Sequence, residues 1–390
     1  MRHPPVDIVI IGGGPAGSAA AVYTARAGYS VCLVERQAFP RETLCGEFLS
    51  REVMAVLRDI GLELEFLSLA PSKIDWFTLY PDRGPRLSEP LGFTAYGMKR
   101  STFDRMLLES ARSNGVSIIQ PAVVESVVRL EQGYEFLFRT SEGLQTIRGR
   151  WAIGAYGRSS PLDGQLKRPF AGIRTGLNGI KFHIPASMLG IVRSDEILIC
   201  AGPGIYCGIN HVDGGSATIC FLERRRRNAH RPRRQVRELV ESNPGLAQIV
   251  TPEALLAVEH AAIYGAGNIY FGPRSVVEDG MLMVGDAARV IAPLAGDGIG
   301  MALQGAQLLG RVFEHERRTP EGRDALEQRY RQEWERLFKV RVRTALLLQR
   351  VLLSTQMRWI TSSLLESAPS ILRTALNMTR GDSMAREAIM

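Results

Sequence analysis

Residues 6–17 read VDIVIIGGGPAG, and this stretch decides the fold. Its β-branched start predicts a buried strand, its glycines predict a tight turn, and the alanine-rich residues 18–27 predict a helix. A second apolar run over residues 29–34 ends at Glu35. We therefore expect the first 35 residues to form a compact strand-helix-strand unit.

Three glycines in this turn have the spacing of a dinucleotide-binding fingerprint. Gly12 permits the turn, Gly14 lets the backbone approach a pyrophosphate, and Gly17 lets the helix pack on the strand. The helix N-terminus faces the phosphates with partial positive charge. Glu35, at the end of the second strand, is placed to accept hydrogen bonds from a ribose diol. The expected contacts also include Pro15, Ala16 and Arg36.

A second glycine-rich motif follows an apolar strand at residues 281–284. GDAA at residues 285–288 precedes PLAGDGIG at residues 293–300, which begins a small-residue helix. With the first motif, this pattern resembles flavoproteins of the para-hydroxybenzoate hydroxylase fold, which include aromatic monooxygenases, geranylgeranyl reductases and flavin-dependent halogenases. The resemblance implies that FAD binds through Asp286, at ribityl or ribose oxygens, and through backbone N–H groups near the flavin pyrimidine. The contacts implied in this turn are Pro293, Gly296, Gly298 and Ile299.

The third element of that family normally reads Asp-Gly-x-x-Ser, but residues 156–160 of this chain read YGRSS. Tyr156 therefore replaces the acid. In hydroxylases of this fold the region is linked to FAD and to the nicotinamide cofactor, so the replacement leaves NAD(P)H binding open. Ser159 and Ser160 have a simpler alternative role, which is to cap a turn.

CGEFLS at residues 45–50 is similar to a Cys-Gly-Glu-x-Leu-Ser segment of the geranylgeranyl reductase branch and of flavoproteins found near bacterial type III polyketide synthases. The resemblance places this segment beside the flavin ring, with Cys45, Gly46 and Glu47 at the cofactor. It makes Cys45 a candidate catalytic residue, the alternative being simple packing of a buried thiol. It also makes Glu47 a candidate proton donor or substrate anchor.

Residues 99–104 read KRSTFD and resemble the family's Arg-x-x-(Leu/Phe)-Asp step. The resemblance implies that Arg100 contacts FAD phosphate or the flavin edge. We expect Asp104 to steady the start of a helix over residues 101–114, with Ser101 as its N-cap. Arg41 either adds positive charge for the phosphates or is a solvated loop residue.

Residues 204–210 read GIYCGIN, where reductases carry a Tyr-x-Trp-x-Phe-Pro strand. The tryptophan is absent and Gly208 stands in its place, which leaves room for an aromatic ring. Tyr206 is therefore a candidate catalytic residue that lines the substrate pocket. Halogenases of this fold need a Trp-x-Trp-x-Ile-Pro stretch and an early lysine for the hypohalous species, and the sequence offers neither, which disfavours halogenation.

The sequence predicts an α/β protein with three parts. A Rossmann-like FAD-binding domain of the para-hydroxybenzoate hydroxylase type is expected over residues 1–75, 100–165 and 275–318. A mainly antiparallel β-sheet substrate domain is inserted over residues 76–99 and 166–274, and a C-terminal helical region follows over 319–390. His183, His211 and His260 lie on the expected substrate sheet, either as acid–base groups or as structural residues. No spacing of histidines, cysteines and acids indicates a metal site.

The chain has 390 residues, 45% of them hydrophobic, and a formal net charge of +8. Five scattered cysteines without a Cys-x-x-Cys pair argue against a disulfide framework and favour the cytoplasm. No signal peptide or membrane-spanning run is predicted.

The arginine run at residues 224–234 predicts a solvated face or attraction of an acidic carrier protein. The basic, leucine-rich C-terminal helices either roof a lipophilic channel or rest on a membrane surface. No motif supports nucleic-acid binding.

These observations predict an FAD-dependent monooxygenase that uses NAD(P)H and O₂ to hydroxylate an aromatic, polyketide or other lipophilic small molecule. The alternative is reduction of an isoprenoid C=C bond, which the CGE segment favours and the missing tryptophan disfavours. A non-catalytic flavin-binding scaffold is a third interpretation.

Overall fold

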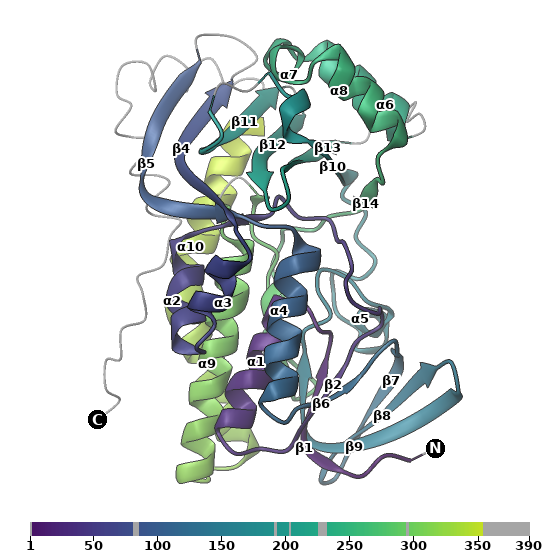
Figure 1. The fold of residues 1–390 in the computed structure, drawn as a ribbon. Helices are drawn as coiled ribbons and strands as arrows, with labels where there is room; N and C mark the ends of the chain where they lie inside the picture. Colours follow the sequence, from purple (N-terminus) through teal and green to yellow (C-terminus); the bar gives the residue numbers. More distant parts are fainter. Residues whose placement is uncertain are drawn as a thin grey trace.

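The computed structural model describes residues 2–80, 86–190, 193–202, 204–224, 232–293 and 296–353. Its strands form two eight-stranded sheets at opposite ends of the molecule, and long helices run beside them (Figure 1). The predicted helices beyond residue 353 and the arginines at 225–227 and 231 lie outside the described residues.

The first sheet has the order β15-β16-β9-β1-β2-β6, with β7 and β8 continuing from β9. The β-branched β1 is its buried centre, and Ile8 pairs in parallel with Val31 on one side and Trp151 on the other. A parallel strand covered on both faces needs such a continuous apolar run. The strands are β1 (Val6–Ile11), β2 (Val31–Val34), β6 (Ser117–Ile119), β7 (Val123–Leu130), β8 (Gly133–Thr140), β9 (Gly143–Gly154), β15 (Val277–Glu278) and β16 (Met281–Met283).

Helix α1 (Pro15–Arg26) packs against α9 (Gly298–Arg318) and α4 (Arg100–Ser113). Four of its alanines, Ala16, Ala19, Ala20 and Ala21, are buried. A Cβ added at Gly310 of α9 would lie 2.6 Å from the Cβ of Tyr23, so only small residues permit this close approach. The remaining helices here are α2 (Arg51–Asp59), α3 (Glu63–Ser68), α5 (Pro161–Gln165) and α10 (Arg323–Leu353).

Two expected boundaries were wrong. The second strand begins at Val31 rather than at residue 29. Helix α4 begins at Arg100, with Lys99 at the N-cap position, so Ser101 lies in the first turn. The Ser101 hydroxyl instead donates a 2.5 Å hydrogen bond to Glu42 Oε1.

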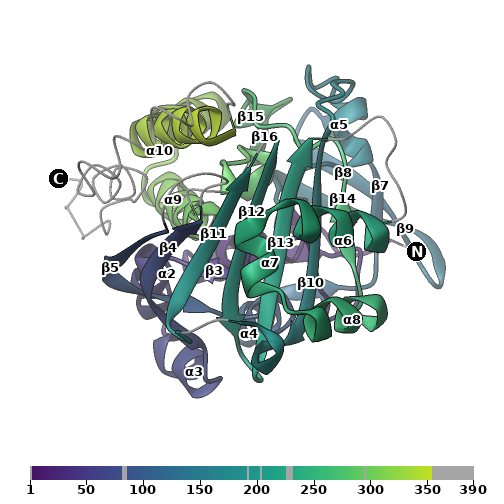
Figure 2. The same ribbon diagram turned by 90° about the horizontal axis from the view of Figure 1, so that it is seen from above.

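The second sheet has the order β14-β10-β13-β12-β11-β4-β5-β3, and α6, α7 and α8 cover its outer face (Figure 2). Alternate residues of β10 point in opposite directions. Ile180, Phe182 and Ile184 pack in the core beneath the helices, whereas Lys181 and His183 lie on the other face. The elements are β3 (Phe48–Leu49), β4 (Ser72–Tyr80), β5 (Leu87–Gly97), β10 (Leu177–Pro185), β11 (Glu196–Gly202), β12 (Ile205–Val212), β13 (Ser216–Arg224), β14 (Tyr264–Ala266), α6 (Pro232–Ser242), α7 (Pro244–Ile249) and α8 (Pro252–His260).

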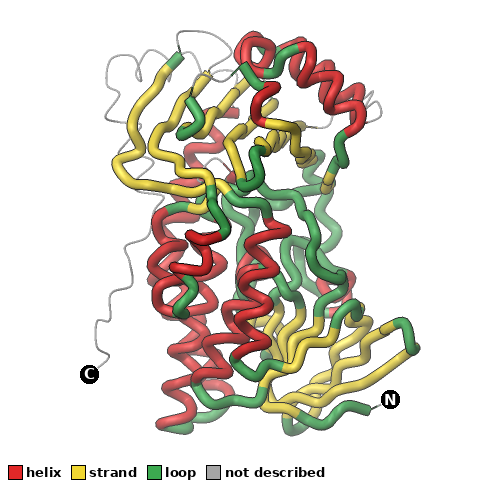
Figure 3. Tube along the Cα trace, viewed as in Figure 1, coloured by secondary structure: helices red, strands yellow, loops and turns green. Residues whose placement is uncertain are grey.

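Loops cross the region between the two sheets several times (Figure 3). The chain enters the second sheet at β3, β4 and β5 and returns through α4; it enters again at β10 and returns through β15 and β16. This arrangement agrees with the predicted α/β class and the inserted, mainly antiparallel sheet. The predicted domain boundaries stay predictions. Within the described residues, no helix combines the length and apolar character needed to cross a membrane.

Candidate active site

A cavity of about 760 Å³ lies between the two sheets. Every residue predicted to contact the cofactor lines it, except Gly17, and so do the catalytic candidates Glu47 and Tyr206. The segments that meet there are the loop after β1, the residue after β2, the Cys45–Glu47 loop, the turn after β16, the start of α9 and the inner face of the second sheet. The cavity therefore brings together motifs from both ends of the chain.

At one end of the cavity, Gly12 and Gly17 have the turn and packing roles predicted for them, and the pyrophosphate contact of Gly14 stays a prediction. Gly12 has a φ of +106°, a region that favours glycine. A Cβ on Gly17 would lie 1.9 Å from the Gly12 carbonyl oxygen, so Gly17 serves helix packing rather than lining the cavity. A Cβ on Gly14 would meet only Arg100 and Arg41, at 3.6 and 3.7 Å, so this position opens toward two guanidinium groups.

Glu35 is buried where β2 ends, and its carboxylate already has protein partners. Oε2 accepts a hydrogen bond from the Gly13 N–H at 2.7 Å, and Oε1 accepts one from the Gln37 N–H at 2.9 Å. Glu35 therefore fixes the glycine turn, and each oxygen keeps a second lone pair for a ribose hydroxyl.

Asp104 binds arginines, which differs from the helix-start role expected for it. Arg100 donates to both of its carboxylate oxygens, at 2.6 and 2.7 Å, and Arg41 Nη1 lies 3.3 Å from Oδ2. The Arg41 side chain is only 12% exposed, so it is not a solvated loop residue. Asp104 thus holds two guanidinium groups beside the N-terminus of α1, an arrangement suited to phosphate oxygens.

The segment that departs from the family pattern is held by a buried network that the sequence did not reveal. The Tyr156 hydroxyl donates to Asp163 Oδ1 at 2.9 Å and accepts from Arg168 Nη1 at 2.9 Å. Arg168 Nη2 also donates to the Ala287 carbonyl at 2.9 Å. Ser160 caps α5, as one of its two expected roles required. The network therefore anchors the turn that carries Asp286.

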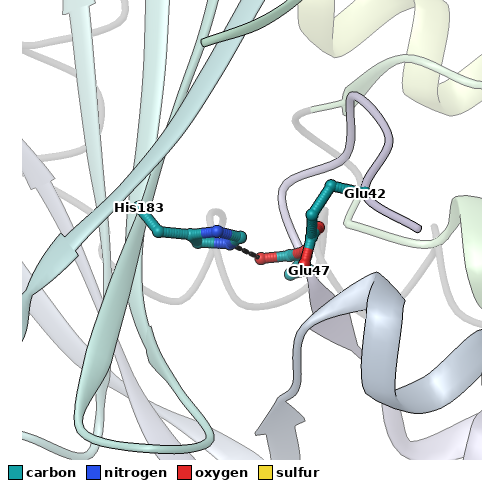
Figure 4. Close-up of side chains that lie close together, drawn as sticks. All are labelled: Glu42, Glu47 and His183. Carbon is teal, nitrogen blue, oxygen red and sulfur yellow. Dashed lines mark hydrogen bonds and ion pairs between the residues drawn. The ribbon is translucent and has the colours of Figure 1, made fainter. Parts of the chain in front are cut away.

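The Cys45–Glu47 loop is clamped to the second sheet through Glu47, whose carboxylate is fully buried. Lys181 Nζ lies 2.5 Å from Oε1. His183 Nε2 lies 2.5 Å from Oε2 (Figure 4). The Thr218 hydroxyl donates to Oε2, and the Arg100 N–H donates to Oε1 at 2.8 Å. Glu47 adopts a φ of +57°, a strained region for a non-glycine residue that these contacts stabilise.

Glu42 extends this cluster, because Lys181 Nζ also donates to Glu42 Oε2 at 2.7 Å. Ligand atoms of Glu42, Glu47 and His183 lie within 4.8 Å of one another, as in a metal site. The Lys181 ammonium, however, binds both carboxylates and already supplies a positive charge. No motif in the sequence marks Lys181 or Glu42 as a site residue, and only the alternation of β10 places Lys181 on the same face as His183.

The charges of this cluster determine its protonation. Burial alone raises the pKa of Glu47, but the hydrogen bond from His183 and the charge of Lys181 outweigh it and lower the pKa to about 2. For Lys181, burial lowers the pKa, but the carboxylates of Glu47 and Glu42 raise the pKa overall. At neutral pH the pair is therefore a carboxylate and an ammonium.

Cys45 is half-buried on the cavity wall. Its Sγ accepts a hydrogen bond from the Glu47 N–H at 3.3 Å, and it interacts with the Arg100 side chain. The thiol thus lies between the arginines of the phosphate end and the Glu47 clamp.

The inner face of the second sheet gives the cavity an apolar wall. Tyr206 and Gly208 of β12 both lie on it, and a Cβ on Gly208 would be 3.3 Å from the Tyr206 hydroxyl. Of the three candidate histidines, only His183 contacts the Glu47 cluster, and His260 is exposed at the end of α8. Other apolar residues of this wall are Phe77, Leu91, Ile197, Ile199, Leu222, Ile269 and Phe271.

The residues that line the cavity fit FAD. The N-terminus of α1 lies beside Arg41 and Arg100, and the same cavity is lined by Asp286, by the glycines before α9 and by the apolar wall. A dinucleotide with a pyrophosphate, a polyhydroxyl chain and an aromatic ring system requires groups of these kinds.

Known proteins share this architecture. The chondrochloren halogenase of a myxobacterium superposes with a TM-score of 0.77 at 18% identity, covering 97% of this chain and 91% of the halogenase. The p-nitrophenol 4-monooxygenase of Pseudomonas putida gives a TM-score of 0.75 at 16% identity, covering 97% and 98%. In sequence, a digeranylgeranylglycerophospholipid reductase of Methanococcoides burtonii is 25% identical over 348 residues, covering 85% of this chain and 80% of the reductase.

The fold and the site together define an FAD-dependent oxidoreductase of the para-hydroxybenzoate hydroxylase type, as the sequence predicted. Residues 5–344 match the FAD binding domain family, and the chain belongs to that family.

Proposed function

We propose that the protein is a monooxygenase that uses NAD(P)H and O₂ to hydroxylate an aromatic, polyketide or other lipophilic small molecule. The supporting observation is the apolar wall of the cavity, which includes Phe77, Ile199 and Leu222. FAD supplies the redox chemistry when bound. An apolar wall favours a substrate that lacks charge.

In this proposal the residues of the chain bind FAD, orient the substrate and set the charge around both. Arg41 and Arg100 hold the phosphates, and Asp286 holds the polyhydroxyl chain. Glu47 acts as a hydrogen-bond acceptor and anchor rather than as a proton donor, because a pKa of about 2 keeps it ionised at neutral pH. Cys45 and Tyr206, which both line the cavity, contact the substrate.

A second candidate function is reduction of an isoprenoid C=C bond. The Cys45–Glu47 segment favours it, and so do the reductase relatives at 25% and 27% identity. The same apolar wall would accept a prenyl chain. The tryptophan replaced by Gly208 argues against this function.

Product mass and oxygen dependence distinguish the two reactions. The purified flavoprotein is incubated with NADH or NADPH and a panel of phenolic, polyketide and prenyl compounds, with and without oxygen. Hydroxylation adds one oxygen atom to the product and consumes O₂. A gain of two hydrogens in the absence of air would instead establish the reductase.

A further inference from the structure

Helix α10 sends a buried arginine to the turn that begins α9. Arg341 is 5% exposed, and its Nη2 lies 2.5 Å from Oδ2 of Asp297, which is fully buried. Arg341 Nη1 also donates to Gln304 Oε1 of α9 at 2.6 Å. An ion pair formed in the interior, between residues 44 positions apart, is costly to desolvate and therefore suggests a specific role.

Asp297 connects two segments of the cavity wall. It lies on that wall between Gly296 and Gly298, at the N-cap position of α9. Its Oδ1 accepts a hydrogen bond from the Ser50 hydroxyl at 3.3 Å, which joins the turn to the end of the CGEFLS segment. A Cβ on Gly300 would lie 2.5 Å from Oδ1, so the carboxylate is closely enclosed by the turn.

This carboxylate presents an electrostatic problem in a flavin site. A reduced flavin carries negative charge, and a buried carboxylate beside it opposes that charge strongly because the local dielectric constant is low. The partial positive charge at the N-terminus of α9 offsets only part of this repulsion. A full positive charge 2.5 Å away offsets the Asp297 carboxylate, and the same Arg341 Nη2 lies 3.8 Å from Oε1 of a second buried carboxylate, Glu52.

We propose that Arg341 is a positioning residue that acts through Asp297. It holds the Gly296–Gly300 turn against the flavin and cancels the Asp297 charge, so that the protein binds reduced FAD well relative to oxidised FAD. The proposal depends on FAD occupying this cavity and not on whether the reaction is hydroxylation or C=C reduction.

The test is a charge-balanced mutant cycle read as the flavin midpoint potential, at about pH 8, well above ordinary carboxyl pKa values. In Arg341→Met, the affinity ratio for reduced over oxidised FAD should fall at least tenfold, which lowers the two-electron potential by about 30 mV. Asp297→Asn should raise the potential. The double variant removes both charges and should return close to wild type.

Arg336→Met is the matched control, because Arg336 belongs to the same helix and pairs with Glu333 at the surface. Its potential should equal that of wild type. The proposal is overturned if Arg341→Met binds FAD with an unchanged potential. It is also overturned if both single variants lower the potential and the double variant lowers it by the sum of the two. If Arg341→Met does not fold, Asp297→Asn decides alone: a raised potential supports the proposal, and an unchanged one refutes it.

Discussion

The two ends of the cavity are built in different ways. At the phosphate end, the glycine turn and Glu35 are local in sequence, and the start of α4 adds Arg100 from a more distant segment. At the end near the second sheet, each important contact joins distant segments. Glu47 meets Lys181 across 134 positions, and Asp297 meets Arg341 from the C-terminal helix. The first end is a local motif, whereas the second depends on the completed tertiary fold.

The largest expected effect comes from a substitution in the glycine turn at the phosphate end of the cavity. In Gly17→Val, the new side chain would collide with the Gly12 carbonyl, because even a Cβ would lie 1.9 Å from that oxygen. Helix α1 cannot then pack on β1, and we expect loss of both FAD binding and cooperative unfolding. Flavin absorbance and thermal denaturation measure this. Gly172→Ala is the control, since its Cβ would enter open space; equal behaviour of the two variants would contradict the prediction.

The next effect tests the end assembled from distant segments. Lys181→Met leaves the Glu47 carboxylate buried without its ammonium partner, and breaking such a pair costs about 3–5 kcal/mol of unfolding free energy. Denaturant titration measures the loss. Glu47→Gln added to Lys181→Met removes the stranded charge, so the double variant should be more stable than the Lys181→Met variant. A double variant weaker than both single ones would argue against this account.

The stabilisation that the Lys181–Glu47 pair contributes depends on pH. The folded pKa of Glu47 is about 2, below the ordinary value of about 4.3, so its stabilising effect is complete above about pH 5. That effect is lost as the pH falls through the folded pKa. The stability difference between wild type and Lys181→Met should therefore shrink in acid. A difference that stayed constant down to about pH 2 would show that charge is not its source.

The smallest expected effect concerns chemistry at the junction of the two ends. Cys45→Ser removes the polarizable sulfur beside Arg100 but preserves its size, so FAD occupancy should be unchanged. We expect turnover to fall about tenfold, equivalent to about 1.4 kcal/mol in the barrier. Cys220→Ser, a second thiol on the cavity wall, is the matched control. If both variants turn over like wild type, Cys45 only fills space.

The contrast between the ends explains what sequence analysis predicted. The glycine spacing and Glu35 are local patterns, and the strand, turn and helix formed as expected. The second motif was predictable because the resemblance joined it to the same ligand.

The missed residues share one property, which is that their partners are set by strand register and helix docking. Lys181 is a single cation in a strand whose inward face was not fixed by the sequence. Arg168 reaches Ala287 across 119 positions, and nothing around residue 168 marks it as unusual. Such pairs cannot be derived from one sequence because many arginines and acids have similar local surroundings.

The alternation of β12 has a consequence for how this enzyme scaffold diversifies. Tyr206, Gly208 and Asn210 line the cavity, whereas Cys207 and Ile209 pack in the core under the outer helices. Substitutions at every second residue of the strand can therefore change the substrate specificity without changing the packing of the hydrophobic core. The cofactor-binding residues lie on other segments, so such substitutions leave them unchanged.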